Sequence, residues 1–371
     1  MNQMTTTPER HLATLRVYGS AISYFTGKLE GYLRYKEIPY QRVAMTPLVR
    51  RAVGKRTGTT QMPAVELPDG RWMTDTTPMI AWLETQHPEP EVIPRDPLQS
   101  FASRLLEDYA DEWLWRPALQ YRWSYRGDAL LLSRRIVDEM MATVPAPGWL
   151  KRAAIRQRQL RRYVHGDGVN AATRASVEGV YLRALDQLEA IFSVRPFLLG
   201  NRPTLADFGF FASMFRHFGL DPTPAAIMLE RAPGVYAWLA RVWNAKAART
   251  RGDLVAGVPE DWSPILREVA TAYLPYLSAN AGAWKQRRRS FDVEIQGAPY
   301  RALPVSRYRV WCLERLRAQF ETLSGDARDG ARALLDDHGC WEPLWRVDAP
   351  ASGYDPGATA PFAPGLPVFG A

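Results

Sequence analysis

Short apolar runs alternate with segments of helical spacing over the first ninety residues. Four runs have the length and apolar character of strands, and they are residues 15–19, 38–43, 64–67 and 71–73. Residues 24–36 have apolar positions spaced as on a helix, and Pro39 marks the point where that helix has ended. A second helix begins at Asp75, whose side chain suits a helix start. The pattern predicts a small α/β unit.

The chain becomes helical after a proline-rich linker at residues 87–97, which is typical of a domain boundary. Four segments with helical spacing follow, at residues 98–125, 129–144, 148–164 and 170–192. A fifth segment, residues 205–218, is apolar on nearly every side, which predicts a buried central helix. Thr204 is placed to cap this helix and Asp207 lies three residues later, so we assign both residues a structural role.

The last third of the chain continues the helical pattern. Helices are predicted near residues 263–279, 305–323 and 326–337. The middle helix has an apolar stripe formed by Tyr308, Val310, Trp311, Leu313, Leu316, Phe320 and Leu323. Soluble proteins avoid exposing such a stripe, so we expect this segment to pack on the preceding helices. The predicted organisation is an α/β domain at 13–87, an all-α helical domain at 98–247 and a helical extension at 248–371.

Composition limits the possible classes of protein. The chain has 371 residues, of which 46% are hydrophobic, enough for a large core. Cys312 and Cys340 are the only cysteines, which excludes a disulfide framework and favours a reducing compartment. Two cysteines and five scattered histidines do not form a closed zinc site, so no metal is expected. No apolar run approaches the ~20 residues that cross a bilayer, and the N-terminus lacks a signal peptide's apolar segment. We therefore expect a cytoplasmic protein with no membrane insertion.

The net charge of +8 is concentrated in two basic runs, residues 151–162 and 285–289. Such runs can bind nucleic acid or anionic surfaces. No known nucleic-acid-reading motif accompanies them, so we interpret them as a solvated helix face and a basic connector, with no nucleic acid as partner. Part of the positive field can instead attract an anionic thiol.

Residues 61–84 form the most informative motif of the chain. An X-Pro bond precedes two short strands joined by a Pro-Asp-Gly turn, and an acidic residue followed by a threonine then opens a helix. This unit resembles the second half of the glutathione-binding domain of the glutathione S-transferase superfamily. Residues 15–43 resemble the first half, and residues 205–218 resemble the capped core helix of the family's C-terminal domain. The resemblance covers residues 14–247 and implies a thioredoxin-like fold for the N-terminal domain.

The resemblance also implies a glutathione site. The proline corresponding to Pro63 is cis in the family, and the backbone of the residue before it, here Met62, pairs with the cysteinyl part of glutathione. The acidic-hydroxyl pair, here Asp75 and Thr76, holds the γ-glutamyl group. The family usually has Glu-Ser or Asp-Ser at this point, and Asp-Thr keeps both functional groups.

A hydroxyl donor near the sulfur would stabilise the thiolate of glutathione, which is the nucleophile of the family. Ser23 stands at the start of the first helix and is the favoured candidate, because the helix N-terminus also stabilises an anion. Ser20 is the alternative donor, and Ser23 can equally be a plain helix cap. This loop contains no cysteine, which argues against the thiol-reductase branch of the family, whose mechanism passes through a mixed disulfide.

Other contacts of the site are weaker predictions. Gln61 can touch the glutathione backbone, and Lys55 or Arg56 can reach its glycyl carboxylate. Tyr109 and Trp113, on the first long helix, can line the site of the electrophile, although aromatic residues more often pack in a core.

Two functions are compatible with the sequence. The first is a glutathione transferase that activates the glutathione thiol for attack on an apolar small-molecule electrophile, with glutathione as cosubstrate. The second is a non-catalytic binding or scaffold protein of the same fold, which uses the extension for interactions. By the same resemblance, we expect a homodimer.

Overall fold

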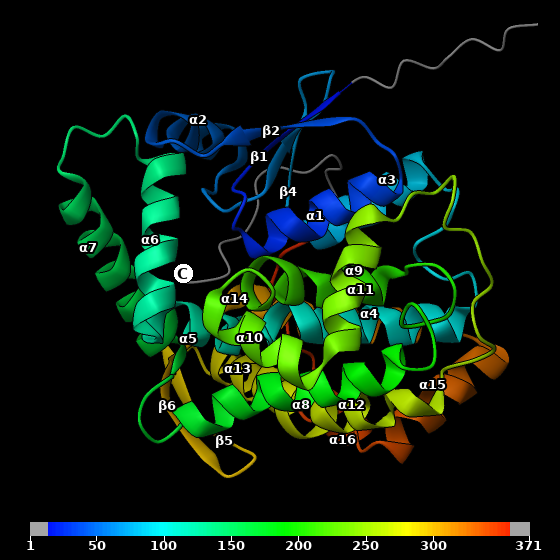
Figure 1. Ribbon diagram of the computed structural model, residues 1–371. Coiled ribbons are helices and arrows are strands. Elements are labelled where there is room, and N and C mark those ends of the chain that lie inside the picture. Colours follow the sequence, from blue (N-terminus) through cyan, green and yellow to red (C-terminus); the bar gives the residue numbers. More distant parts are fainter. Residues whose placement is uncertain (1–13, 357–371) are drawn as a thin grey trace, which may run out of the picture.

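The computed structural model describes residues 14–356 of the chain and places a small mixed sheet above a large helical body (Figure 1). The sheet has the strand order β2-β1-β3-β4. Its strands are β1 (Leu15–Gly19), β2 (Tyr40–Ala44), β3 (Ala64–Glu66) and β4 (Trp72–Thr74). β1 pairs with β2 in parallel and with β3 antiparallel, and β4 pairs antiparallel with β3. This is the thioredoxin-like arrangement that the sequence predicted.

Three helices belong to this sheet unit, namely α1 (Tyr24–Tyr35), α2 (Pro47–Thr57) and α3 (Thr76–Gln86). Each begins at a polar cap: Ser23, Thr46 and Asp75 accept hydrogen bonds from backbone N–H groups in the first turn of their helices. Figure 1 shows α1 between the sheet and the helical body. Two of these caps, Ser23 and Asp75, are also candidates for the site.

The helical body follows the linker. Its helices are α4 (Pro97–Glu112), α5 (Trp115–Ser124), α6 (Arg126–Met140), α7 (Gly148–Gln159), α8 (Arg174–Phe192), α9 (Leu205–Ser213), α10 (Pro222–Arg231) and α11 (Pro233–Asn244). Short π-helical turns, η1 (Leu160–Val164) and η3 (Met214–Phe218), extend α7 and α9. All residues of α9 are buried, as its all-round apolar pattern predicted, and Thr204 and Asp207 form a capping box.

The predicted long helix over residues 98–125 is wrong in one respect, because it is broken into α4 and α5 at Trp113–Leu114. Pro117 explains the break. It lacks the N–H that would bond to the carbonyl of Trp113 in a continuous helix, and proline is tolerated only in a first helical turn.

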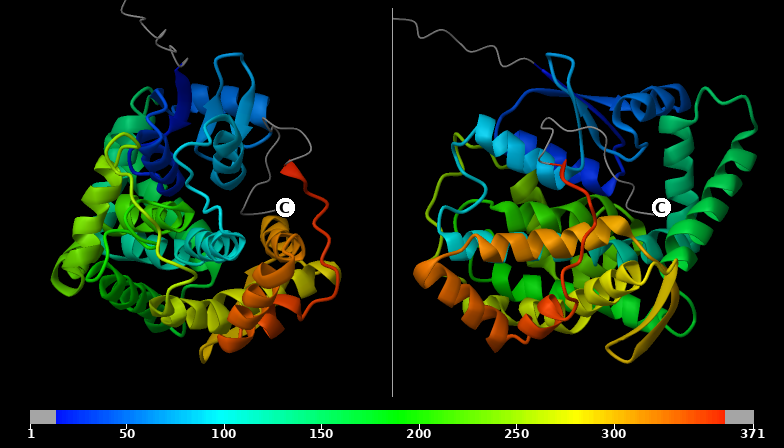
Figure 2. Two further views of the ribbon diagram at one scale, coloured as in Figure 1. Left: turned by 90° about the vertical axis from the view of Figure 1, so that its right-hand side faces the viewer. Right: turned by 180° about the vertical axis from the view of Figure 1, so that it is seen from behind.

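The extension contains α12 (Ser263–Glu268), α13 (Leu274–Lys285), α14 (Arg307–Glu321), α15 (Gly325–Asp337) and α16 (Trp341–Trp345). The apolar stripe of α14 is covered within the chain, since Trp311, Leu316 and Phe320 are all buried. Figure 2 shows α14, in orange, lying along the helical body with α15 and α16 around it. The predicted domain bounds stay a prediction, and the last residues assigned to the extension, 357–371, lie outside the described part, as does residue 13.

A β-hairpin in the extension was not predicted. β5 (Ser290–Ile295) and β6 (Ala298–Pro304) pair antiparallel around a turn in which Gln296 and Gly297 both have positive φ. Two such residues match the twist of a tight hairpin. The signal is present in the sequence, because apolar and polar residues alternate along β5.

Buried charges join the three parts of the chain. Lys28 of α1 donates to Glu107 of α4 at 2.7 Å and also to Asp111, with all three side chains almost fully buried. Arg315 of α14 pairs with Asp108 at 2.6 Å and also lies 3.7 Å from Glu107, so that Glu107 has a cation from α1 and one from α14. Since a buried ion that loses its partner is costly, α4 depends on both neighbours for its counter-charges.

Two further properties concern residues 14–356 only. No helix in this range is long and apolar enough to cross a membrane. No group of three or more His, Cys, Asp or Glu side chains in it is arranged to hold a metal ion.

Candidate functional site

Three segments of the sheet unit meet at one end of the sheet. Tyr18 pairs with Ala64, and Ala64 pairs with Thr74, so the residues that follow β1, precede β3 and follow β4 lie together. These residues are the loop 20–23, the Met62–Pro63 bond and Asp75. The Met62–Pro63 bond is cis, as the sequence predicted. The fold thus brings the main predicted glutathione contacts to one place.

The two candidate serines of the loop have different surroundings. Ser23 is half-buried at the start of α1, where its Oγ accepts a long hydrogen bond of 3.4 Å from the Thr26 N–H. Within residues 14–356 the Ser23 hydroxyl donates to no group. Ser20 is 1% exposed, and its hydroxyl already donates to Glu139 at 2.7 Å. Ser23 is therefore the serine with a donor available to a ligand.

Three charged residues of the helical body hold this loop. The Glu139 carboxylate, on α6, accepts from the Ser20 hydroxyl and, at 2.9 Å, from the N–H of Ala21. Arg216 donates to the carbonyl of Ala21 at 2.5 Å, and Arg122 donates to the carbonyl of Ile22 at 2.8 Å. Sequence analysis did not find these residues, because their contacts span about a hundred residues or more. The position of Ser23 is thus set by the helical body.

Arg122 and Arg216 are themselves fixed. Arg122 makes a bidentate ion pair with the buried Asp221, at 2.7 and 2.9 Å, and Arg216 pairs with Glu30 of α1 at 2.6 Å. Bidentate guanidinium–carboxylate pairs are geometrically strict. The loop is consequently attached to a rigid support.

Asp75 and Thr76, the predicted γ-glutamyl pair, lie at the start of α3. Asp75 has a positive φ of 71° and its Oδ1 accepts from the Thr77 N–H at 3.2 Å. Its Oδ2 is shielded from solvent and has no hydrogen-bond partner in the described residues. Thr76 is 3% exposed. An unpartnered buried carboxylate oxygen costs free energy, so this subsite suits a hydrogen-bond donor.

The extension covers this acidic subsite. Burial raises the pKa of Asp75 to about 6, and the Tyr308 hydroxyl and the charge of Arg315, both from α14, counteract this shift. Tyr308 is itself buried, with its pKa raised well above the usual value by burial and by Asp75. A side chain from outside the sheet unit thus lies beside Asp75.

The predicted electrophile contacts Tyr109 and Trp113 are not brought to this place. Both are buried, Tyr109 against Phe210 and Tyr273 and Trp113 against Tyr276 and Tyr300. They form core contacts with α9 and with the extension.

Other aromatic residues approach the start of α1 instead. Phe25 stacks on Trp115 with ring centroids 5.9 Å apart, and Trp115 meets Tyr163 edge-on at 6.2 Å. All three residues are half-buried. Sequence analysis missed Trp115, although residues two apart on a helix do not face the same side and Trp113 and Trp115 should therefore have been considered separately.

The remaining predicted contacts are on or near α2. Lys55 and Arg56 are exposed in its last turn, and Gln61 is half-buried, with its N–H donating to the Thr59 hydroxyl at 3.3 Å. Within residues 14–356, Lys55 and Arg56 make no hydrogen bond or ion pair with Ser23 or Asp75.

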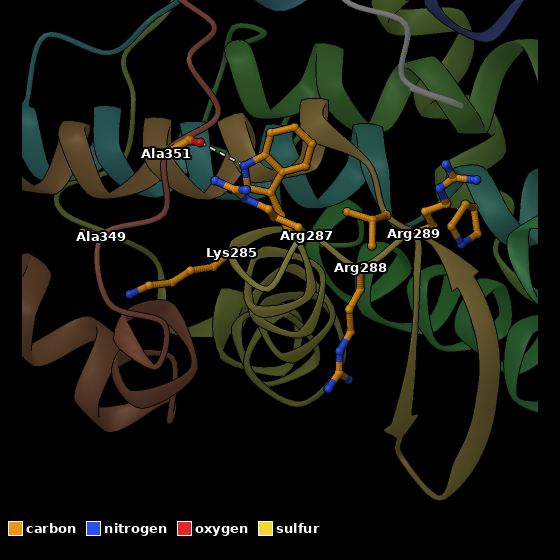
Figure 3. A pocket seen from close by; sticks show the side chains of 9 residues that line it. Lys285, Arg287, Arg288, Arg289, Ala349 and Ala351 are labelled. Atoms are coloured by element: carbon orange, nitrogen blue, oxygen red, sulfur yellow. Dashed lines mark hydrogen bonds between the residues drawn. The ribbon is translucent and has the colours of Figure 1, made fainter.

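A separate cavity of about 860 Å³ lies on the extension, bordered by Trp284, Val305 and the basic run 285–289. Figure 3 shows Lys285, Arg288 and Arg289 pointing in different directions, and Trp284 donating to the carbonyl of Ala351. The cationic side chains do not converge on one point. This agrees with the interpretation of this run as a basic connector.

Family comparisons identify two parts of the chain. Residues 17–91 match the family described as "Glutathione S-transferase, N-terminal domain". Residues 153–245 match the family described as "Glutathione S-transferase, C-terminal domain". No curated protein matches the sequence.

Several solved structures are similar to part of this chain. A glutathione S-transferase of Methylobacterium radiotolerans, in complex with glutathione sulfonate, is 20% identical, with 66% of this chain and 100% of that chain covered and a TM-score of 0.39. The β-etherase LigF of Sphingobium sp. strain SYK-6 is 23% identical, with coverages of 62% and 95% and a TM-score of 0.42. A GST-like protein of Pseudomonas syringae is 17% identical, with coverages of 63% and 71% and a TM-score of 0.42.

Proposed function

Because the chain belongs to the glutathione S-transferase superfamily, we propose that it binds glutathione at the end of the sheet unit and activates its thiol for attack on an electrophile. The cysteinyl part would pair with the Met62 backbone beside the cis bond. The γ-glutamyl ammonium would bind the buried Oδ2 of Asp75 once the Tyr308 side chain has moved aside. Lys55 or Arg56 would receive the glycyl carboxylate. A homodimer remains an expectation of this proposal.

The observation that carries the proposal is the unused donor of Ser23 at the N-terminus of α1. A free thiol with a pKa near ~8.5 is only a few per cent ionised at neutral pH. A hydroxyl donor and a helix N-terminus both favour the anion, and a pKa lowered by about two units would make the bound thiol mostly thiolate. The proton released on ionisation passes to solvent, and the thiolate is the nucleophile.

A second function is favoured by one specific contact, the cover of Tyr308 over Asp75. If α14 stays in place when ligands are present, the γ-glutamyl subsite is closed and the protein is a non-catalytic binding or scaffold protein. The transferase function requires the Tyr308 side chain to move away from Asp75 so that the γ-glutamyl ammonium of glutathione can bind there. The two functions therefore differ in whether α14 moves.

Isothermal titration with glutathione, followed by a conjugation assay with a panel of electrophiles, tests the proposal. We expect binding in the micromolar to millimolar range, typical of a cosubstrate, and loss of binding in Asp75→Ala. Asp69→Ala, in the exposed turn between β3 and β4, is the matched control. Absence of glutathione binding to the wild type would refute the transferase function and favour the scaffold.

A further inference from the structure

We propose that the tip of the α6–α7 arm binds the surface of a membrane that contains anionic lipids. The arm consists of α6, α7 and the loop 141–147 that joins them. Trp149 and Leu150, at the tip, enter the headgroup region, and the basic residues of α7 contact the lipid phosphates. The tip contains none of the proposed glutathione contacts, so the proposal does not depend on the proposed function.

The helix α7 has an uncovered side. None of its twelve residues is buried, whereas every other described α-helix contains at least two buried residues. Figure 1 shows α6 and α7 side by side at the left edge of the molecule, and Figure 2 shows the same pair from behind. Polar contacts attach its inner side. Lys151 donates to the carbonyls of Met141 and Val144 at 3.0 and 3.2 Å, and Arg156 donates to the Ser133 hydroxyl at 3.3 Å. The outer side of α7 therefore faces solvent.

The tip of the arm is apolar and exposed. The side chain of Trp149 is 66% exposed and that of Leu150 is 47% exposed. Pro145 and Pro147, in the loop before them, are exposed as well, and residues 141–150 contain no charged residue. Single exposed apolar residues are ordinary, but tryptophan beside leucine at a projecting end is the chemistry of a membrane-interface anchor.

The charges that follow the tip are all positive. Residues 151–162 contain six Lys or Arg, and residues 140–166 contain no Asp or Glu. Arg158 and Arg161 are exposed on the outer side of the arm. Within residues 14–356, none of the following cations forms an ion pair: Lys151, Arg152, Arg156, Arg158 and Arg161.

The neighbouring helices differ from α7 in this respect. Arg134 of α6 pairs with Asp138 at 3.6 Å. At the start of α8, Arg174 pairs with Glu178 at 2.9 Å. The lack of counter-charges is therefore particular to α7, and its cations are available to an external anion.

The positive surface continues onto α2. Residues 38–65 contain five cations and no Asp or Glu, and Arg51 is exposed. The pKa of Arg50 is lowered first by partial burial and then by the charge of Arg158, which places the two guanidinium groups near each other. Basic surfaces of this kind are attracted to the negative potential of anionic membranes.

An anionic membrane matches both parts of this surface. Its headgroup region accepts Trp149 and Leu150, and its phosphates accept the arginines. A second copy of this chain is a poorer occupant, because two acid-free arms would repel each other. Nucleic acid would use the cations, but its binding sites combine them with aromatic residues along one groove, whereas here an uncharged tip precedes the basic run.

Sedimentation of the full chain with lipid vesicles tests the proposal. Vesicles of phosphatidylcholine alone are compared with vesicles that contain equal parts of phosphatidylcholine and phosphatidylglycerol. We expect at least about tenfold tighter binding to the anionic vesicles, because each cation near such a surface contributes about fivefold. The preference should disappear in ~1 M salt, where charges are screened within about 3 Å.

Two variants of the arm separate its two parts. Arg158→Gln with Arg161→Gln should weaken binding to the anionic vesicles by about 25-fold. Trp149→Ala should weaken it by about tenfold through the lost apolar contact. Because these side chains are exposed, the melting temperature should not change. Arg288→Gln with Arg289→Gln is the matched control, since it removes the same two charges from the basic run of the extension and should bind as the wild type does.

The outcomes that would overturn the proposal are distinct. Equal binding of the wild type to both kinds of vesicle, or no binding to either, would reject it. An equal loss in the control variant would make the effect one of net charge and not of the arm. Tighter binding to a DNA duplex, unchanged in Trp149→Ala, would assign the surface to nucleic acid. A smaller oligomer of Trp149→Ala without vesicles would assign it to a second copy of the chain.

Discussion

The carboxylate of Glu139 accepts a 2.7 Å hydrogen bond from the hydroxyl of Ser20, across 119 positions of the chain. This contact joins α6 of the helical body to the loop that carries Ser23. Its consequence is that the thiol site depends on a residue outside the sheet unit.

We predict that Glu139→Ala disorders the loop and lowers both stability and activity. Two hydrogen bonds to a charged acceptor are lost, so we expect a free energy of unfolding lower by about 1–3 kcal/mol. Urea unfolding and the conjugation rate measure the two effects. Asp138→Ala removes an exposed neighbouring carboxylate and should change neither. If the Glu139 variant matched this control in both assays, the loop would be held by Arg122 and Arg216 alone.

Ser23→Ala should raise the pKa of the bound glutathione thiol and lower turnover more than affinity. One hydrogen bond to a thiolate is worth roughly 1.5–3 kcal/mol, which corresponds to a ten- to hundredfold loss of turnover. The ultraviolet absorbance of the thiolate, followed against pH, reports the shift directly. Ser20→Ala is the comparison: it should lose stability through its contact with Glu139 but leave the midpoint of the thiol titration in place. The reverse outcome would assign the donor to Ser20.

Asp75→Asn should weaken glutathione binding and, at neutral pH, raise the free energy of unfolding. The pKa of Asp75 is about 6 in the folded chain and about 3.9 in an unfolded one, so the folded state prefers the protonated acid. Stability is therefore complete below about pH 4 and is lost as the pH rises through 6. The asparagine variant should be more stable than the wild type at pH 7, by about 3 kcal/mol, and equal to it near pH 4.

Thermal melts across that pH range, together with glutathione titration, test this prediction. Asp69→Asn, in the exposed turn, supplies the control curve. Parallel stability curves for Asp75→Asn and the wild type would contradict the assignment of a buried, reluctantly ionised carboxyl group. Undiminished glutathione affinity would separately remove Asp75 from the ligand site.

Arg315→Met should be severely destabilising, because it leaves Asp108 and Glu107 of α4 without their cation from α14. Breaking a buried pair in this way costs about 3–5 kcal/mol. Arg346→Met removes the cation of an exposed pair with Glu342 on α16 and should cost at most about 1 kcal/mol. Denaturant midpoints of the two variants provide the measurement. Similar midpoints would mean that water reaches the α4 carboxylates.

Deletion of the chain after residue 250 should cause aggregation. The helix α4 is buried along nearly its whole length, and α14 and α15 provide part of its cover. Removing them exposes apolar side chains together with unpaired carboxylates. Light scattering of the purified fragment checks this outcome. A soluble fragment that keeps its melting temperature and glutathione affinity would make the extension an independent module.

Local signals in the sequence predicted the parts of the structure that depend on neighbouring residues. The cap at Thr204, the buried helix α9 and the cis bond before Pro63 all follow from short motifs. The break at Pro117 and the hairpin at Gln296–Gly297 also have local signals, in the proline and in the alternation along β5, which the prediction did not include.

Contacts between distant segments were not predictable in this way. Nothing near Ser20 in the sequence indicates Glu139, and nothing near Asp75 indicates Tyr308. Their side chains meet only because the helical body and the extension pack against the same end of the sheet unit. The ring contacts of Trp115 with Phe25 and Tyr163 have the same origin. The site residues carried over from the resemblance stay predictions until the variants above are measured.

The buried position of Lys28 between Glu107 and Asp111 limits how this protein can be recombined with its relatives. A chimera that takes its sheet unit from this chain and its helical body from another member would bury a lysine ammonium without these carboxylates. The converse chimera would bury the carboxylates without the ammonium. A stable chimera would therefore need Lys28, Glu107 and Asp111 from the same parent. These three residues have to change together, although they lie on both sides of the boundary between the sheet unit and the helical body.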